Sequence, residues 1–381
     1  MSSHTASTPP ARITLSMCEA AEITAIATGE QYRWAHTALA AAGWERTANG
    51  VHTRLFGDRA AAERAVSTLV HFARRHRTAV VTSTRPHLGD IAGAIAHQLP
   101  GPWTPTIEVY SNPVWQQDLV PWLWDSGELT RAVQAGQVTH AAKLTNQAAG
   151  IDLLLIERPG HSSGYVIGAF APDGFDDNYE GPYSPAGAVL PQDPYRAAAE
   201  IADRYLPGYQ QALHARRTAA VAYALSRIRD ERTELQHLTA TGPDPAHTER
   251  FADVAWYEVL DIVKHAPPLI ERCRRSPLPL ENSTAITRLE VALGTGTTIV
   301  NGWHSLLTGT PDAPRAYRAE HFPEAKATRN RAIHPVIDTW LAHGDTLLRH
   351  AAPAAPGRAP VLAPAAVPAL PPAASTPARP R

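Results

Sequence analysis

Cysteine is scarce in this chain. Cys18 and Cys273 are its only cysteines, they lie far apart, and neither belongs to a CxxC motif or a Cys/His cluster. Disulfide frameworks and structural zinc sites need several such residues at close spacing. We therefore expect neither of them, no redox chemistry, and no metal ion or other cofactor.

Long apolar runs are missing as well. The opening residues, Met1 to Ala11, are polar, and no apolar stretch approaches the about 18 residues that cross a bilayer. We expect neither a signal peptide nor a membrane segment, and hence a cytoplasmic protein without a membrane partner.

Lysine is also scarce, and arginine supplies almost all of the positive charge. The net charge is −1, with an acidic excess in residues 101–200 and basic excesses in the first hundred residues and after residue 300. Arginine richness beside abundant alanine and proline is what GC-rich coding gives, so it does not by itself indicate nucleic-acid contact. The balance argues against a dedicated DNA-binding domain, and a nucleic-acid surface would lie toward the two ends of the fold.

The chain is long enough for two domains. Its 381 residues are 44% hydrophobic, which allows a sizeable core. We predict an α+β protein with a disordered leader (1–12), an α+β domain (13–205), a long connecting helix (206–241), a small helical bundle (249–350) and a disordered Ala/Pro-rich tail (351–381).

Within the α+β domain, helical and strand patterns alternate. Asn49-Gly50 predicts a two-residue hairpin turn, and Asp58 is a suitable N-cap for the helix that follows. Predicted helices cover 31–43, 60–76, 90–99, 129–150 and 195–205, and predicted strands cover 44–48, 51–56, 78–84, 106–111, 151–157 and 165–171. Helix, hairpin and helix thus occur twice, at 31–76 and 129–205, which suggests a duplicated module within a sheet layered with helices. Three tryptophans lie close together between the two modules, and core packing explains them better than an interaction surface: Trp115, Trp122 and Trp124.

The second half of the chain is helical. Residues 209–238 are predicted to form one long helix whose apolar seam could pair with another helix or self-associate: Val221, Ala224, Ile228, Leu235 and Leu238. Proline-containing breaks then separate helices over 251–275, 283–307 and 314–349. The Ala/Pro tract after His350 has too little apolar bulk to offset the entropy of ordering it.

One short motif resembles a hydrolase element. Gly160-His161-Ser162-Ser163-Gly164 matches G-x-S-x-G, in which a serine nucleophile sits on a strand-to-helix turn. Here a second strand is predicted after Ser162 instead of a helix, so a polar hairpin loop explains the same residues. A serine hydrolase acting through Ser162 remains an alternative.

A second motif lies in the last helical stretch. In Arg329-Asn330-Arg331-Ala332-Ile333-His334, an arginine and a histidine brought to one face could hold a phosphate and move a proton. Within a small helical bundle this arrangement resembles the HEPN (higher eukaryotes and prokaryotes nucleotide-binding) family, many of whose members are RNases. The resemblance covers at most residues 251–349, and it implies Arg329 and His334 as a catalytic pair with Asn330 at the polar position.

A structural interpretation of the same residues is also open. An R-x4-H spacing recurs at Arg232 to His237, and Pro335 directly follows His334, so the stretch also fits a helix boundary. We favour a non-enzymatic accessory or regulatory protein that contacts a protein or a nucleic acid. A HEPN-like ribonuclease or toxin and a serine hydrolase are the alternatives, and the oligomeric state is left open.

Overall fold

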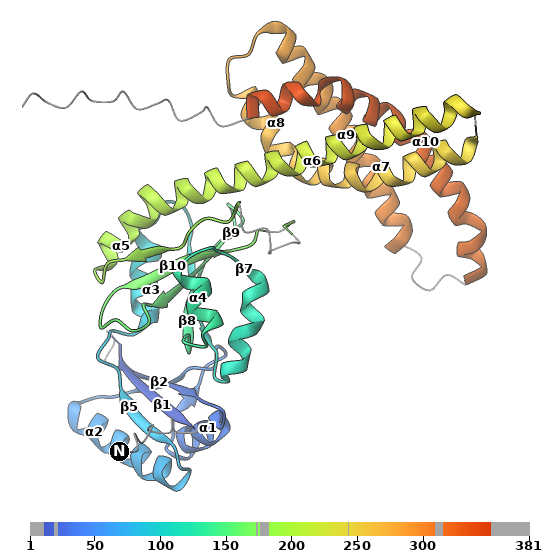
Figure 1. Ribbon diagram of the computed structural model, residues 1–381. Helices are drawn as coiled ribbons and strands as arrows, with labels where there is room; N and C mark the ends of the chain where they lie inside the picture. Colours follow the sequence, from blue (N-terminus) through green and yellow to red (C-terminus); the bar gives the residue numbers. More distant parts are fainter. Residues whose placement is uncertain are drawn as a thin grey trace, which may run out of the picture. The chain divides into compact units, whose positions relative to one another are not determined.

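The computed structural model describes residues 11–18, 22–172, 174–175, 183–242, 244–308 and 315–351, with only the backbone described at 241 and 315–321. The protein has the α+β fold expected from the sequence (Figure 1). It divides into unit 1, Met1–Ala219, and unit 2, Ala220–Arg381. Nearly all of the predicted leader and tail lies outside the described residues, although Ala11 is buried and Arg12 begins the first strand.

The N-terminal part of unit 1 is a five-stranded sheet with the order β3-β4-β2-β1-β5. Its strands are β1 (Arg12–Met17), β2 (Glu22–Thr28), β3 (Glu45–Arg46), β4 (His52–Leu55) and β5 (Ala79–Thr82). The pairing is antiparallel except between β1 and β5. Helices α1 (Tyr32–Ala41) and α2 (Arg59–Arg75) pack on this sheet through one apolar cluster that includes Ile13, Leu15, Leu39 and Leu69.

Two local predictions in this sheet can be compared directly with the structure. Asp58 caps α2 as predicted, because its Oδ1 accepts a hydrogen bond from the backbone N–H of Ala61 at 2.6 Å. The predicted hairpin is present, but its two-residue turn is wrong. The N–H of Thr47 donates to the carbonyl of Val51 at 2.8 Å, which leaves Ala48, Asn49 and Gly50 in the loop. Gly50 has φ 84°, the left-handed conformation that such a three-residue loop requires.

The rest of unit 1 is built on a second sheet with the order β11-β10-β9-β8-β6, and β7 also pairs with β10. Its strands are β6 (Thr104–Val109), β7 (Leu123–Trp124), β8 (His140–Asn146), β9 (Ile151–Glu157), β10 (Tyr165–Phe170) and β11 (Ala188–Leu190). The helical segments beside it are α3 (Leu88–Gln98), the 3-10 helix η1 (Pro113–Trp122), α4 (Glu128–Gln134), α5 (Pro194–Glu200) and the π-helical turn η3 (Ile201–Tyr205).

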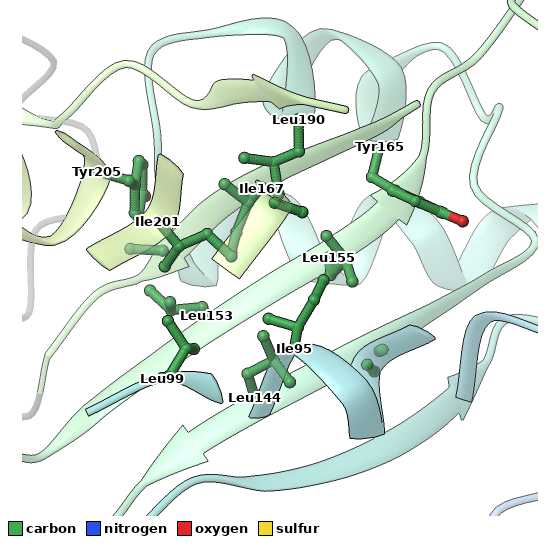
Figure 2. Packing of buried hydrophobic residues seen from close by; sticks show 14 of the residues in the cluster. Ile95, Leu99, Leu144, Leu153, Leu155, Tyr165, Ile167, Leu190, Ile201 and Tyr205 are labelled. Atoms are coloured by element: carbon green, nitrogen blue, oxygen red, sulfur yellow. The ribbon is translucent and has the colours of Figure 1, made fainter. Parts of the chain in front are cut away.

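Both faces of this second sheet are covered, which explains the unbroken apolar run in β9. Leu153 and Leu155 pack with residues of α3 and η3, such as Ile95 and Ile201, as Figure 2 shows. Leu154 belongs to a separate cluster on the other side, with residues of α4. Neighbouring side chains of a strand point to opposite faces, so a strand buried on both faces needs apolar residues at successive positions.

The predicted helix over 129–150 is wrong in its second half. Helix α4 ends at Gln134, Gly136 follows with φ 65°, and β8 begins at His140. Glycine adopts this left-handed conformation readily and commonly ends helices. Strand β8 then pairs with β6 and β9, so long-range pairing decides its conformation.

Unit 2 is a helical bundle. Its helices are the C-terminal part of α6 (Leu206–Thr241), α7 (Pro245–His265), α8 (Pro267–Arg274), α9 (Leu280–Thr308) and α10 (Arg315–Ala351). The predicted seam of α6 packs within this chain: Val221, Ala224 and Ile228 share one core with residues of α7 to α10. Arg229 and Arg232 of α6 add ion pairs to Asp345 and Asp338 of α10. Among the described residues, no helix is both long and apolar enough to cross a bilayer.

Candidate functional site

The sequence motif around Arg329 borders a pocket of unit 2. The pocket has a volume of about 590 Å³, within the range of ligand sites. Helices α7, α9 and α10 form its walls. Its lining combines aromatic, aliphatic and charged side chains: Asp253, Trp256, Tyr257, Leu260, Val300, Trp303, His304, Leu307, Phe322, Lys326 and Arg329.

Arg329 is held between two indole rings. Its guanidinium carbon lies 4.6 Å from the ring centroid of Trp256 on α7 and 4.5 Å from that of Trp303 on α9. The side chain is only 8% exposed. A planar guanidinium stacks well on aromatic faces, and the contact strengthens when water is excluded. Arg329 therefore joins all three helices at the pocket wall.

A carboxylate of α7 neutralises this buried charge. Asp253 Oδ1 accepts hydrogen bonds from Nη2 of Arg329 at 2.7 Å and from the side-chain amide of Asn330 at 3.1 Å, and its Oδ2 lies 2.5 Å from Nζ of Lys326. Burial alone would raise the pKa of Asp253. The hydrogen bonds from Lys326 and Asn330 and the charges of Lys326 and Arg329 outweigh burial, so the pKa is lowered. The carboxylate thus remains ionised, and both of its oxygens have polar partners.

Helical spacing explains how these groups meet. Residues three or four apart lie on the same face of a helix. Lys326, Arg329 and Asn330 consequently share one face of α10, while Asp253 and Trp256 share one face of α7. The oxygen of the Asn330 amide also accepts hydrogen bonds from the Arg329 guanidinium, at 2.6 Å from Nη2 and 3.0 Å from Nε. Asn330 therefore orients the arginine and does not face the pocket as a free polar group.

His334 lies in a different environment. Its ring stacks on Phe251 at a centroid distance of 5.9 Å, and the guanidinium of Arg232 lies over the same phenyl ring. Positions five apart on an α-helix are turned roughly 140° from each other. Within the described residues, neither a hydrogen bond nor a ring contact joins His334 to Arg329. The structure brings Arg329 and Asn330 together with Asp253, but it places His334 outside that group.

The helix boundary predicted at His334 and Pro335 is wrong, because α10 runs without a break from Arg315 to Ala351 with Pro335 inside it. Proline removes one N–H donor from the helix interior, a cost of roughly 3 kcal/mol. The neighbouring residues Ile333, Val336 and Ile337 are all buried in the core of unit 2. Packing of this face offsets the lost hydrogen bond.

The loop that carries Ser162 is a hairpin connection between β9 and β10, as the alternative interpretation predicted. Ser162 is exposed, and a strand follows it. Arg85 holds the loop in place by donating hydrogen bonds to the carbonyls of Arg158, His161 and Gly164. In the described part of the chain, no histidine or carboxylate is hydrogen-bonded to Ser162.

The three clustered tryptophans have different environments. Trp124 is buried and stacks on Phe175 at 5.5 Å, which confirms core packing for this one. Trp115 packs edge-on against Tyr32 and is 40% exposed, and Trp122 is 65% exposed. Core packing was therefore the wrong interpretation for Trp122.

The pocket can bind an apolar or aromatic group but offers few free charges. Tyr257 is 68% exposed at its edge, whereas the Asp253 carboxylate and the Arg329 guanidinium are paired with each other. Over the residues that the structure describes, no group of three or more His, Cys, Asp or Glu side chains could hold a metal ion. Comparisons of the chain with protein families, with curated proteins and with solved structures find no match.

Proposed function

We propose that this chain is a cytoplasmic accessory or regulatory protein that acts by binding a partner protein at the pocket of unit 2, and not by catalysis at Arg329 and His334. The pairing of Arg329 is the observation that carries this proposal. Its guanidinium is bonded to Asp253 and Asn330 and stacked between Trp256 and Trp303. A guanidinium engaged in this way has few donors left for a scissile phosphate.

The charges of the pocket favour a protein over a nucleic acid. Binding to a phosphate backbone depends on unpaired lysines and arginines that displace counterions. Here Lys326 lies 2.5 Å from Asp253 and 3.7 Å from Glu249, so both cations of the pocket wall are paired with carboxylates. What remains open to a ligand is mostly apolar surface.

That surface suits an anchoring side chain. Tyr257, Trp303 and Phe322 provide aromatic faces, Leu260 and Leu307 provide aliphatic ones, and charged groups lie beside them. Buried anchor residues surrounded by a polar rim carry most of the binding energy in protein interfaces. An aromatic or large aliphatic side chain of the partner would fill the pocket.

Site-specific photo-crosslinking tests the proposal. A photoreactive phenylalanine at Tyr257 is compared with one at Tyr223, a tyrosine of the same unit with a similar exposed fraction, 68% against 64%. In cells that naturally make the protein, we expect a crosslinked product from position 257 and none from 223. The captured partner is then purified and its affinity measured.

Two substitutions decide whether the pocket makes the contact. Leu307→Arg places a charge on the pocket lining, and Leu280→Arg places one on an exposed leucine of α9 outside it. Losing an anchor contact of about 2 kcal/mol lowers affinity roughly thirtyfold. We expect this for Leu307→Arg and no change for Leu280→Arg. Equal affinities in the two variants would refute the pocket as the binding site.

The ribonuclease alternative is tested on the same purified protein. Labelled single-stranded RNA should stay intact, and any RNA binding should be weak and fall steeply with salt. RNA cleavage that disappears in both Arg329→Ala and His334→Ala, each shown to be folded, would replace the binding proposal with a HEPN-like nuclease.

A further inference from the structure

Strand β5 is the last strand of the first sheet of unit 1. It pairs in parallel with β1, in the register Ile13 to Val80 and Leu15 to Thr82. The N–H of Ala79 donates to the carbonyl of Ala11, directly before β1, and the N–H of Ser83 donates to the carbonyl of Leu15 in β1. Because successive N–H groups of a strand alternate in direction, those of Val80 and Thr82 point away from the sheet. Within the described residues, no strand pairs with this outer edge.

The residues of this edge also lack the charged side chains and prolines that commonly protect an open strand. Ala79-Val80-Val81-Thr82 contains no charged residue and no proline, and Val81 is 39% exposed. Natural sheets commonly place lysine, proline or a covering segment at such positions, because an open edge can pair with another chain. An uncharged, β-branched open edge is suited to strand addition.

An apolar groove adjoins the C-terminal end of this edge. Its volume is about 810 Å³, and Thr82 lies in its lining. Leu15, Met17 and Ile23 form the wall on the sheet side, and Ala62 lies on the α2 side. The lining residue Ala62 has a small side chain, and Leu15 and Met17 of β1 are accessible from the groove. Met17 is consequently 60% exposed although it lies on the core side of the sheet.

The core-facing side chains of β5 lie on the same face of the sheet as the groove. Val80 and Thr82 are opposite Ile13 and Leu15, so their side chains lie on the core face of the sheet. A strand added to β5 would place every second side chain on that face. The side chain of the added strand beside Thr82 would therefore lie next to the groove, while the backbone of that strand would satisfy the outward N–H groups of β5.

Charged side chains lie near both ends of the proposed docking site. Three exposed arginines lie at the end of α2 and just before β5: Arg74, Arg75 and Arg77. At the other end, the groove is lined by Asp58, Arg59 and Glu63, of which Arg59 and Glu63 are paired. An acidic residue of the partner is complementary to the arginine end, and uncharged apolar residues are complementary to the strand and the groove.

We infer that β5 and the adjoining groove form a second docking site, which accepts an extended segment of a partner protein by strand addition. The segment has apolar residues at alternate positions, no proline among its paired residues, and an acidic residue beside Arg77. The site lies in unit 1 and is independent of the pocket in unit 2. The chain's own ends do not match, because Met1–Pro10 is polar and residues 352–381 are interrupted repeatedly by proline.

A displayed library of random ten-residue linear peptides, selected against the full-length protein, supplies the probe. We expect the enriched peptides to alternate apolar and polar residues, to lack internal proline and to carry Asp or Glu near one end. The strongest peptide is synthesised, and its affinity is measured by fluorescence anisotropy. Arg77→Gly removes a charge but tolerates the φ of 50° at this position, and it should lower the affinity for the acidic peptide.

Two variants separate strand addition from other binding. Thr82→Pro deletes an outward N–H while sparing those that bond to β1, and loss of about one hydrogen bond lowers affinity roughly five- to tenfold. Ala62→Leu fills the groove without touching the strand edge and should weaken binding at least as much. Ala60→Leu, at an exposed position of α2 outside the groove lining, should leave the affinity unchanged.

The outcomes are distinct. Circular dichroism first establishes that each variant is folded. Loss of affinity in both Thr82→Pro and Ala62→Leu, with Ala60→Leu unaffected, supports the inference. Unchanged affinity in Thr82→Pro, enrichment of proline-rich peptides, or failure to enrich any peptide overturns it. Because the pocket of unit 2 contributes no residue to this site, Leu307→Arg should bind the peptide normally.

Discussion

The guanidinium of Arg329 donates a hydrogen bond across 2.7 Å to Oδ1 of Asp253, which links α10 to α7. The two residues are far apart in the sequence, and without Asp253 the nearly buried guanidinium of Arg329 would have no carboxylate to balance its charge. The arginine that the sequence motif highlights is thus part of the framework of the bundle, and its removal has consequences for folding before any for chemistry.

Replacing Arg329 should destabilise unit 2. Arg329→Ala leaves Asp253 with one fewer cation and removes the stacking on Trp256 and Trp303, so we expect a loss of about 3 kcal/mol in the free energy of unfolding. Arg331→Ala, at an exposed neighbouring position, should change it by less than about 0.5 kcal/mol. Urea denaturation followed by circular dichroism measures both. Equal stabilities of the two variants would contradict the structural role.

The Asp253 carboxylate should make stability depend on acid. Its pKa is lowered from the usual 3.8, so the unfolded chain takes up the proton first as the pH falls. Wild type should therefore be more stable than Asp253→Asn at pH 7. The difference should shrink as the pH drops below about 4 and through the lowered pKa. Denaturation curves at several pH values test this, and a pH-independent difference would contradict it.

A histidine pair in unit 1 predicts a second pH effect, in a higher range. Nδ1 of His36 and Nε2 of His52 share a hydrogen bond at 2.8 Å. Burial, with contributions from Arg46 and His52, lowers the pKa of His36 to about 4 from 6.5. The unfolded chain therefore binds the proton first, so the stability is full above pH 6.5 and is lost as the pH falls toward 4.

The size of this effect is modest because His36 is only half-buried. After allowance for solvent screening we expect a loss of about 1 kcal/mol between pH 7 and pH 5. Thermal unfolding across this range should show it in wild type and less of it in His36→Gln. A histidine NMR titration checks the cause, because a His36 that titrates near 6.5 would disprove it.

Two glycines on long helices provide a matched test of helix packing. A Cβ built on Gly344 of α10 would lie 2.5 Å from Leu225 Cδ1 of α6, whereas one on Gly302 of α9 would meet nothing within 4 Å. Gly344→Ala should thus cost about 1–3 kcal/mol from overpacking. Gly302→Ala should stabilise the protein by up to about 1 kcal/mol through helix propensity. Chemical denaturation distinguishes them, and effects of the same sign would contradict the packing of α6 on α10.

Local signals in the sequence were sufficient for several elements of the fold. Asp58 caps α2 through its own side chain, and the long helix α6 follows from periodicity over many turns. The antiparallel hairpin of β9 and β10 was also predicted, because a short loop joins two apolar runs. In each case the determining interactions lie within a few residues or along one continuous pattern.

Other elements depend on partners distant in the chain. Strand β8 has helical composition and becomes a strand because β6 and β9 flank it. Strands β1 and β2 were not predicted at all, and β1 is paired with β5 more than sixty positions later. Pro335 remains inside α10 because its neighbours are packed in the core. No local rule contains this information.

The candidate site was found from the sequence only in part. Arg329 and Asn330 were singled out by their spacing in the sequence. Arg329 lines the pocket of unit 2, and Asn330 accepts a hydrogen bond from it. The sequence did not single out Asp253, Trp256 or Trp303, because each appears there as an ordinary residue of an amphipathic helix. A charge pattern offered one signal: three cationic or amide groups of α10 share a face that needs an acidic partner.

The stacked arginine also limits how this sequence can diverge. Asp253, Trp256, Trp303 and Arg329 lie on three helices, and changing one leaves a buried charge or a void that only a change in another can correct. Homologues should therefore keep or exchange these residues as a set. An invariant arginine at this position would record selection for a folded bundle, and it should not by itself be taken as the mark of an enzyme.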